Sequence, residues 1–218
     1  SYKDQDLFEI FLGSKDDKSK HRYSRVALKM LGVKSKNAEE FEKANIVVKS
    51  IRVEENDKIV ESMSFPAFSV MRLIEERWEE SDIYRYFTET KFLFMIYKKK
   101  KENYYLDRAQ FWNMPYEDIE GSLKNEWHRA KKIFTEGVKL TPIYHKNRLN
   151  ISNNLPKLSN TSILHVRNHS SKSVYVIDGK VYGNGSINRD ADRLPNGDYI
   201  SKQCFWLNNK YIEKIIKK

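Results

Sequence analysis

Residues 40–50 read Glu-Phe-Glu-Lys-Ala-Asn-Ile-Val-Val-Lys-Ser, an acidic start followed by a short apolar strand that ends in lysine. This layout is typical of the active site of metal-dependent nucleases. Alternate residues of a strand share a face, so Val47 and Lys49 are expected to point into one site. Such a site needs a carboxylate two residues before the lysine, because carboxylates hold the Mg²⁺ that activates water for phosphodiester hydrolysis. Valine cannot bind a metal, so the stretch indicates either a nuclease site that has lost a ligand or an ordinary apolar strand.

The overall composition favours a folded domain with a polyanionic partner. The 218 residues carry 40 Lys and Arg against 30 Asp and Glu, a net charge of +10, and 13% of them are aromatic. This apolar and aromatic content excludes a disordered chain, and the length suffices for one domain over residues 1–218, with room for two lobes. A basic, aromatic-rich domain favours nucleic acid as the partner, although a lysine-rich proteome would give the same charge.

Cysteine and histidine usage narrows the class further. Cys204 is the only cysteine, which excludes an internal disulfide or a cysteine-based zinc site and indicates a cytoplasmic, reducing location with Cys204 buried. The five histidines have no metal-ligand spacing, and no apolar run reaches membrane-spanning length, so no membrane partner is expected. The chain begins with Ser1 in place of an initiator Met, and we expect it to be a piece of a longer protein.

Hydrophobic periodicity predicts a mixed α/β chain. Helices are expected over 3–12, 22–31, 68–80, 115–137 and 208–218. Strands are expected over 46–53, 59–65, 90–97, 104–112, 163–167 and 173–182, with a hairpin-like run over 194–205. The first two strands should form one hairpin and the next two another, and residues 143–160 should form a long polar loop.

Two later segments strengthen the interpretation as a nuclease frame. The chain first has a helix, a charged loop, the acid and the strand that carries Lys49. Two further segments come after these in order: Leu164-His165-Val166-Arg167, and then the run from Leu194 to Lys202. In this order the chain resembles the MutH family of mismatch-repair endonucleases and the related GATC-cutting type II restriction enzymes of the Sau type, specifically their C-terminal half. The resemblance implies a restriction-endonuclease-like (MutH-like) fold, a mixed β-sheet flanked by helices, with two lobes around a DNA cleft.

The family's catalytic set can be carried over position by position. Its first Asp falls on Glu40, its Glu on Val47 and its Lys on Lys49, and a further acid on the preceding helix falls near Leu28. Because Leu28 and Val47 are apolar, the resemblance implies a degenerate domain with no cofactor of its own. It would bind double-stranded DNA containing GATC and act as a regulatory, allosteric effector domain. An upstream catalytic MutH-like domain of the parent restriction enzyme would use Mg²⁺.

The resemblance places the DNA contacts in the C-terminal half. The loop that begins at Arg167 should reach base edges in the major groove, because Arg pairs with guanine and Asn with adenine, and GATC contains both bases. Arg189 and Arg193 are expected to contact phosphates. The DNA-binding candidates are Arg167, Asn168, His169, Lys172, Arg189, Arg193, Tyr199 and Lys202. An ordinary basic loop and hairpin would contain the same residues.

A second segment keeps every residue type of a live nuclease site. Asp82 is followed, after six residues, by Glu89 and then Lys91. The alternative hypothesis is therefore an active Mg²⁺-dependent endonuclease that uses Asp82, Glu89 and Lys91. Solvated charges at a junction between a helix and a strand explain the same pattern.

Overall fold

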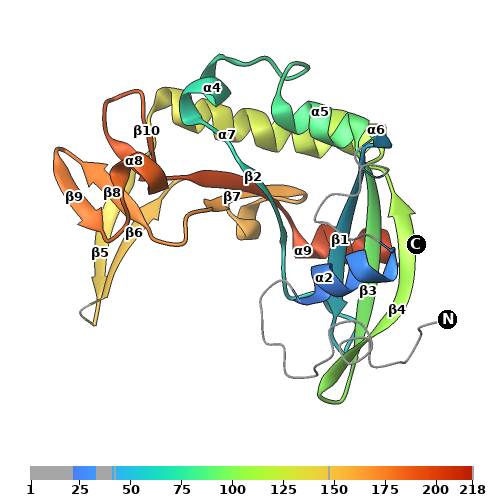
Figure 1. The fold of residues 1–218 in the computed structure, drawn as a ribbon. Helices are drawn as coiled ribbons and strands as arrows, with labels where there is room; N and C mark the ends of the chain where they lie inside the picture. The colour runs from blue at the N-terminus through green and yellow to red at the C-terminus, as the bar shows by residue number, and fades with distance from the viewer. Residues whose placement is uncertain (1–21, 33–40, 42, 147, 218) are drawn as a thin grey trace. The chain divides into compact units, whose positions relative to one another are not determined.

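The computed structural model describes residues 22–32, 41, 43–146 and 148–217, and their helices and strands are drawn in Figure 1. The chain divides into two compact units. Unit 1 comprises Ser1–Glu61, Arg85–Pro115 and Ile212–Lys218, and unit 2 comprises Ser62–Tyr84 and Tyr116–Tyr211. The fold is mixed α/β, as predicted, but its described strands form four small sheets in place of the single mixed sheet that was expected, and the helix expected over 3–12 lies outside the described residues.

Unit 1 is built on a three-stranded sheet in the order β1-β3-β4. The strands are β1 (Ile46–Val53), β3 (Lys91–Lys100) and β4 (Asn103–Trp112). The antiparallel hairpin of β3 and β4 is confirmed, whereas β1 pairs with β3 in parallel. The hairpin expected between 46–53 and 59–65 is therefore wrong. The strand β3 is buried from Phe92 to Tyr97, and pairing β1 with this apolar strand buries more surface than a local polar hairpin would.

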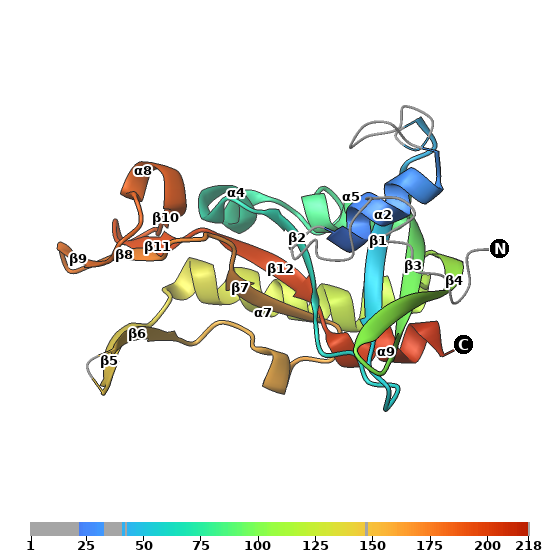
Figure 2. The same ribbon diagram turned by 60° about the horizontal axis from the view of Figure 1, so that its bottom comes forward.

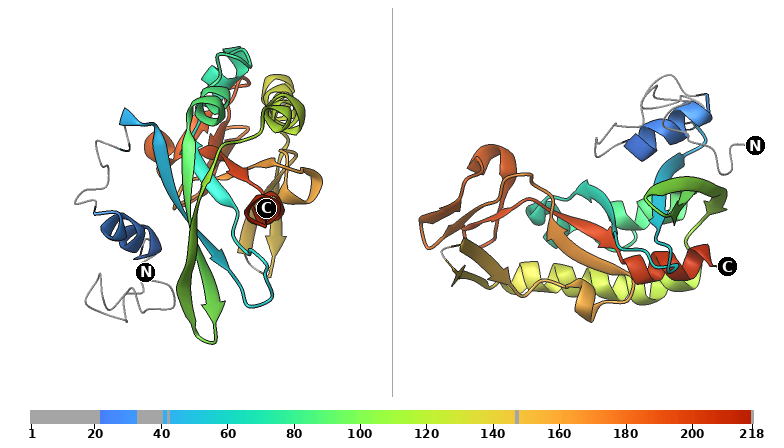
Figure 3. Two further views of the ribbon diagram at one scale, coloured as in Figure 1. Left: turned by 90° about the vertical axis from the view of Figure 1, so that its right-hand side faces the viewer. Right: turned by 90° about the horizontal axis from the view of Figure 1, so that it is seen from below.

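One helix covers each face of this sheet, as the left view of Figure 3 shows. The helix α2 (Arg22–Met30), predicted over 22–31, packs Tyr23, Val26 and Ala27 against the face that carries Val48. The end of α9 (Asn209–Ile216), predicted over 208–218, lies over the other face, where Gln110 Nε2 donates to the Ile215 carbonyl at 3.2 Å. The two faces of β1 therefore differ in what covers them.

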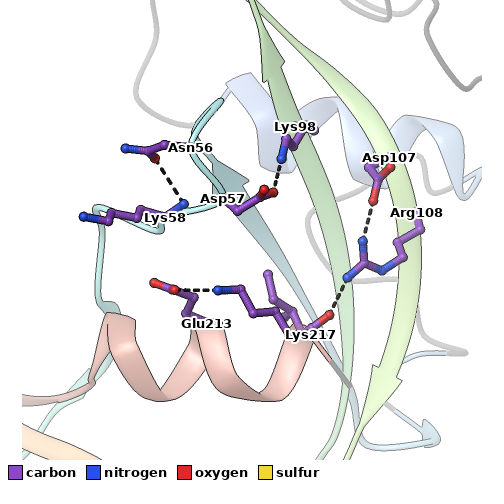
Figure 4. Close-up of polar contacts among 9 residues, drawn as sticks. Asn56, Asp57, Lys58, Lys98, Asp107, Arg108, Glu213 and Lys217 are labelled. Carbon is purple, nitrogen blue, oxygen red and sulfur yellow. Dashed lines mark hydrogen bonds and ion pairs between the residues drawn. The ribbon is translucent and has the colours of Figure 1, made fainter.

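Polar contacts fix the turn after β1 and the end of α9 to the sheet (Figure 4). Asp57, which has a positive φ of 62°, forms an ion pair with Lys98 of β3. Arg108 of β4 donates to the backbone carbonyl of Ile216 and pairs with its neighbour Asp107. The polar turn over 54–58 is thus confirmed, although the chain does not return from it as a strand beside β1.

Unit 2 contains a second three-stranded sheet, in the order β2-β12-β7, that packs against a long helix. The strands are β2 (Met63–Ala67), β12 (Gln203–Leu207) and β7 (Leu164–Asn168), and both pairings are antiparallel. The helical run expected over 115–137 is confirmed as α6 (Tyr116–Asp118), a π-helical turn (Ile119–Leu123) and α7 (Lys124–Glu136). It buries Trp127, Ala130 and Phe134 at helical spacing, so α7 supplies much of the core of this unit.

The remaining helices differ from the prediction. The helix expected over 68–80 is shorter, α4 (Val70–Glu75), and a separate helix α5 (Asp82–Glu89) follows it. The C-cap of α4, Glu76, has an extended backbone with ψ at 151°, and this ends α4 before residue 80. Within the described ranges, no helix is long and apolar enough to cross a membrane.

The far end of unit 2 is rich in short strands (Figure 2). A four-stranded sheet has the order β10-β11-β8-β9, from β10 (Ala191–Arg193), β11 (Tyr199–Ser201), β8 (Val174–Ile177) and β9 (Lys180–Gly183), and α8 (Ile187–Asp190) precedes β10. The region predicted as one strand over 173–182 is a hairpin, because Asp178 and Gly179 have positive φ angles of 51° and 76°, which suit a two-residue turn.

The polar loop expected over 143–160 is also wrong. Most of that region forms a two-stranded antiparallel sheet of β5 (Leu140–His145) and β6 (Arg148–Asn153), followed by a short 3₁₀ helix (Leu158–Asn160). The many asparagines hid these strands, because asparagine is uncommon in strands and breaks the apolar alternation by which strands are recognised.

Candidate nucleic-acid interface

Two of the positions predicted to form a degenerate nuclease site, Val47 and Lys49, lie on an edge strand of unit 1. Val47 and Lys49 of β1 share one face, where they stand beside the buried rings of Phe92 and Phe94 on β3. Lys49 is half-buried, and burial lowers the pKa of its ammonium below the ordinary value because the charged form loses hydration. A valine without oxygen donors and a lysine cation do not form a Mg²⁺ site, so the residues present at this face do not fit the metal.

The other two positions of the carried-over set are not brought to this face. Leu28 lies on α2, which packs on the opposite face of the sheet, the face of Val48. The expectation that Leu28 shares one site with Val47 and Lys49 is therefore corrected, because successive residues of β1 point to opposite faces of the sheet. Glu40 lies outside the described residues. Within those residues, no group of three His, Cys, Asp or Glu side chains could hold a metal ion.

The alternative site with intact acids lies along the helix α5 and at the start of β3. Asp82 is the first residue of α5 and Glu89 its last, which places their Cα atoms about 10 Å apart at the usual rise of an α-helix. The Asp82 carboxylate accepts from Arg72 Nη2 at 2.6 Å, and the Lys91 ammonium lies 5.7 Å from the centre of the Phe111 ring. An active site built on Asp82, Glu89 and Lys91 stays a prediction, and the structure already pairs its first acid with Arg72.

The DNA-contact candidates of unit 2 begin with Arg167, which is presented on an aromatic surface. Arg167 is exposed near the end of β7, and its guanidinium carbon lies 4.7 Å from the centre of the Trp206 ring on β12. The Trp206 ring stacks in turn near His165, with 6.4 Å between ring centres and 28° between planes. The guanidinium therefore rests on a layered support, which limits the orientations that it can adopt.

The support itself is held by hydrogen bonds at the start of β7. Asn208 Nδ2 donates to the Thr161 carbonyl at 3.0 Å, so the Asn208 amide oxygen faces His165 Nδ1, 2.5 Å away. That oxygen only accepts, and Nδ1 must therefore carry the proton. Burial lowers the pKa of His165, which favours the neutral ring. The Nδ1 side of the His165 ring is thus fixed by Asn208, whereas the buried His165 Nε2 has no hydrogen-bond partner among the described residues.

Main-chain hydrogen bonds join the loop after β7 to two other segments. The backbone N–H of His169 donates to the Lys202 carbonyl at 2.8 Å, and the Lys202 N–H donates to the Asp190 carbonyl at 2.8 Å. The Ser170 hydroxyl donates to the same Asp190 carbonyl at 2.7 Å. The loop after β7, Lys202 and the helix α8 thus meet around the backbone of Asp190.

The side chain of Asp190 adds a negative charge to this junction of the β7 loop, Lys202 and α8. It is 6% exposed, and its carboxylate accepts from Arg189 Nε at 3.0 Å and from the Ser186 N–H at 2.9 Å. These bonds, first of all that of Arg189, hold the pKa of Asp190 at about 2, and the positive charge of Lys172 adds to the effect. Arg189 therefore already has a partner within the protein, which leaves fewer donors for the phosphate contact predicted for it.

Arg193 and Tyr199 lie on neighbouring strands of the four-stranded sheet. They are directly opposite each other in the pairing of β10 and β11, so their side chains share a face. Arg193 is exposed, Tyr199 is half-buried, and Tyr199 is also paired with Val176 of β8. A phosphate contact by Arg193 and a DNA contact by Tyr199 remain predictions, and they would be made from one sheet face.

Two features of this interface escaped the interpretation of the sequence. The first is Trp206, whose position beneath Arg167 depends on the pairing of β7 with β12 and leaves no mark in the sequence. The second is visible in the sequence: between Glu136 and Asp178 the chain contains no Asp or Glu at all. In a chain with 30 acidic residues, such a run is a signal for a surface that meets a polyanion.

Comparison with known proteins agrees with these observations. No family model matches the chain. The chain is 32% identical, over 225 aligned positions, to the type II restriction enzyme Sau3AI of Staphylococcus aureus. The match covers 88% of this chain but 44% of that enzyme, so the chain spans less than half the length of its relative. From this identity over most of its length, we conclude that the chain belongs to the family of Sau3AI-type restriction endonucleases, matching the C-terminal part of the enzyme.

Proposed function

We propose that this chain binds double-stranded DNA at GATC sites and does not itself cut the DNA. The observation that carries the proposal is the presentation of Arg167 on Trp206, next to a loop fixed by His169 and Lys202. A guanidinium held in a limited set of orientations is suited to bidentate pairing with guanine O6 and N7, and less of its freedom is lost on binding. Asn168, the next residue, is suited to adenine.

The absence of cleavage is supported by the edge strand of unit 1. Valine stands where a nuclease of this kind needs its metal-binding carboxylate, and Lys49 remains beside it. A site without that ligand lacks the means to position Mg²⁺ and to activate water. We therefore assign the chain to binding, with cleavage left to a catalytic domain elsewhere in a longer, Mg²⁺-dependent enzyme.

In such an enzyme the chain would act as a regulatory domain. Binding of a second GATC site here would favour the active state of the catalytic domain, provided that this domain binds DNA more tightly in that state. The longer enzyme should then cleave DNA with two GATC sites faster than DNA with one. Equal rates on both substrates would contradict the regulatory role.

One binding experiment tests the proposal for the chain itself. The protein is incubated with a GATC duplex and with a scrambled duplex of equal length, with and without Mg²⁺, and both retention and cleavage are measured. Preferential retention of the GATC duplex without cleavage is the expected result. Cleavage in Mg²⁺ would overturn the proposed inactivity. Equal, strongly salt-dependent retention of both duplexes would indicate binding through phosphates alone.

A further inference from the structure

The hairpin of β5 and β6 in unit 2 pairs with no other strand of the described residues. It projects from the end of α7, on the same side of the unit as β8 and β9 (Figures 1 and 2). A two-stranded hairpin is marginally stable by itself in water. Near its end, Tyr144 is 67% exposed, which is unusual for a large aromatic side chain. An exposed element of this kind is more readily explained by an interaction than by the stability of the fold.

The two faces of the hairpin have different chemistry. Residues opposite each other share a face, so Leu140, Pro142 and Tyr144 lie on one side with Leu149 and Ile151. Apart from Asn153, which lies opposite Leu140, this side is apolar, and Ile151 is buried. The other side carries hydroxyl and amide groups from Thr141, Asn150 and Ser152, with Ile143. The polar side therefore offers hydrogen-bond donors that suit phosphate oxygens.

Lysines lie at both ends of the hairpin. Lys139 precedes β5, Lys146 follows it, and Lys157 lies after β6. Among the described residues, none of these three ammonium groups has a carboxylate within ion-pair distance, whereas Lys132 of α7 has Glu136 at 3.7 Å. The hairpin lies inside the run without Asp or Glu, so its positive charge is not balanced locally.

We propose that the hairpin of β5 and β6 is a second DNA-contacting element, which binds phosphates of the duplex outside the bases read by Arg167. The partner follows from charge complementarity, because the hairpin combines uncompensated lysines with a polar face. The six residues of β5 span about 20 Å at the usual rise of a strand, which exceeds the width of the major groove, about 12 Å. Lys139 and Lys146 are therefore far enough apart to reach phosphates on opposite sides of a groove.

The inference rests on the proposed function, since it extends the DNA interface of the same chain. It predicts that neutralising both lysines removes phosphate contacts without removing base reading. Each phosphate contact contributes about 0.9 to the slope of log affinity against log salt concentration. The double variant Lys139→Gln/Lys146→Gln should therefore lower the slope by about 1.8, which corresponds to about a 10-fold smaller loss of affinity between 50 and 200 mM salt.

The test measures affinity for the GATC and scrambled duplexes over a range of salt concentrations. The matched control is Lys132→Gln/Lys210→Gln, which removes two exposed lysines of the same unit but outside the hairpin. We expect a smaller slope for the hairpin variant alone, with its preference for GATC retained. Shortening the DNA on both sides of GATC should weaken binding by the wild type more than binding by the hairpin variant.

The possible outcomes separate this inference from the proposed function. If the wild type prefers GATC and both double variants keep the wild-type slope, the hairpin inference is overturned and the proposed function stands. If the wild type shows no preference for GATC but the hairpin variant still lowers the slope, the proposed function fails and the hairpin remains a DNA contact. Self-association that only the hairpin variant abolishes, with an unchanged slope, would assign the hairpin to a second copy of the chain and overturn the inference.

Discussion

Replacing Arg167 by lysine separates base reading from positive charge. Lysine keeps the charge but cannot form the two parallel hydrogen bonds that a guanidinium makes to guanine. A bidentate pair of this kind discriminates against the wrong base by about 1–3 kcal/mol, so the preference for GATC should fall about 5- to 150-fold. The contact of Arg167 with Trp206, at 4.7 Å, is on the protein surface, where a lysine ammonium can also lie over the ring, so the free energy of unfolding should fall by less than about 1 kcal/mol.

The assay is competition between GATC and scrambled duplexes, with urea unfolding of the free protein measured in parallel. Arg193→Lys is the matched control, because a phosphate contact depends on charge and should tolerate lysine. We expect Arg167→Lys to lose preference while its affinity for scrambled DNA and its salt dependence stay near those of the wild type. Full retention of the GATC preference by Arg167→Lys would refute the assignment of Arg167 to base reading.

Three further predictions concern Val47 of β1 and the fold of unit 2. Val47→Glu should leave GATC cleavage in Mg²⁺ at background, because one carboxylate beside Lys49 does not supply the several oxygen ligands that Mg²⁺ needs, and efficient cleavage would show that the site is otherwise complete. The pKa of Asp190 is about 2, below its ordinary 3.8, so its ionised form stabilises the fold above pH 3.8. This contribution disappears as the pH falls through 2. In urea unfolding, the difference in stability between the wild type and Asp190→Asn should therefore shrink between pH 3.8 and pH 2. Gly183→Ala should destabilise the protein by more than about 1 kcal/mol in thermal or urea unfolding, because φ is +92° and a Cβ would lie 2.2 Å from the Ser173 carbonyl oxygen; wild-type stability would contradict this packing.

The sequence predicted the elements whose apolar residues recur with a clear period. The strands β3 and β4, the run from α6 to α7 and the helix α9 lie close to where periodicity placed them. The prediction failed where the partner of a segment is distant in the chain. Residues after Lys58 were expected to return beside β1, but β2 pairs with β12. Local patterns carry no information about such pairings.

The candidate site shows the same division. The order of Val47, Lys49 and Arg167 along the chain led to the family resemblance, and the relationship to a type II restriction enzyme confirms it. The spacing of Asp82 and Glu89 looked favourable, but it placed the two acids at opposite ends of a helix. A spacing that suits a strand has a different meaning in a helix, because the rise per residue is less than half as large.

The sequence by itself determined the family and the excess of positive charge, and it placed a valine at position 47, since each of these depends only on which residue occupies which position. The tertiary structure decided which groups meet. Arg167 rests on Trp206, and the loop of His169 joins Lys202 and Asp190, because hydrogen bonds between distant strands bring these segments together. Strand pairing is a property of the whole chain, and it creates contacts that no local pattern contains.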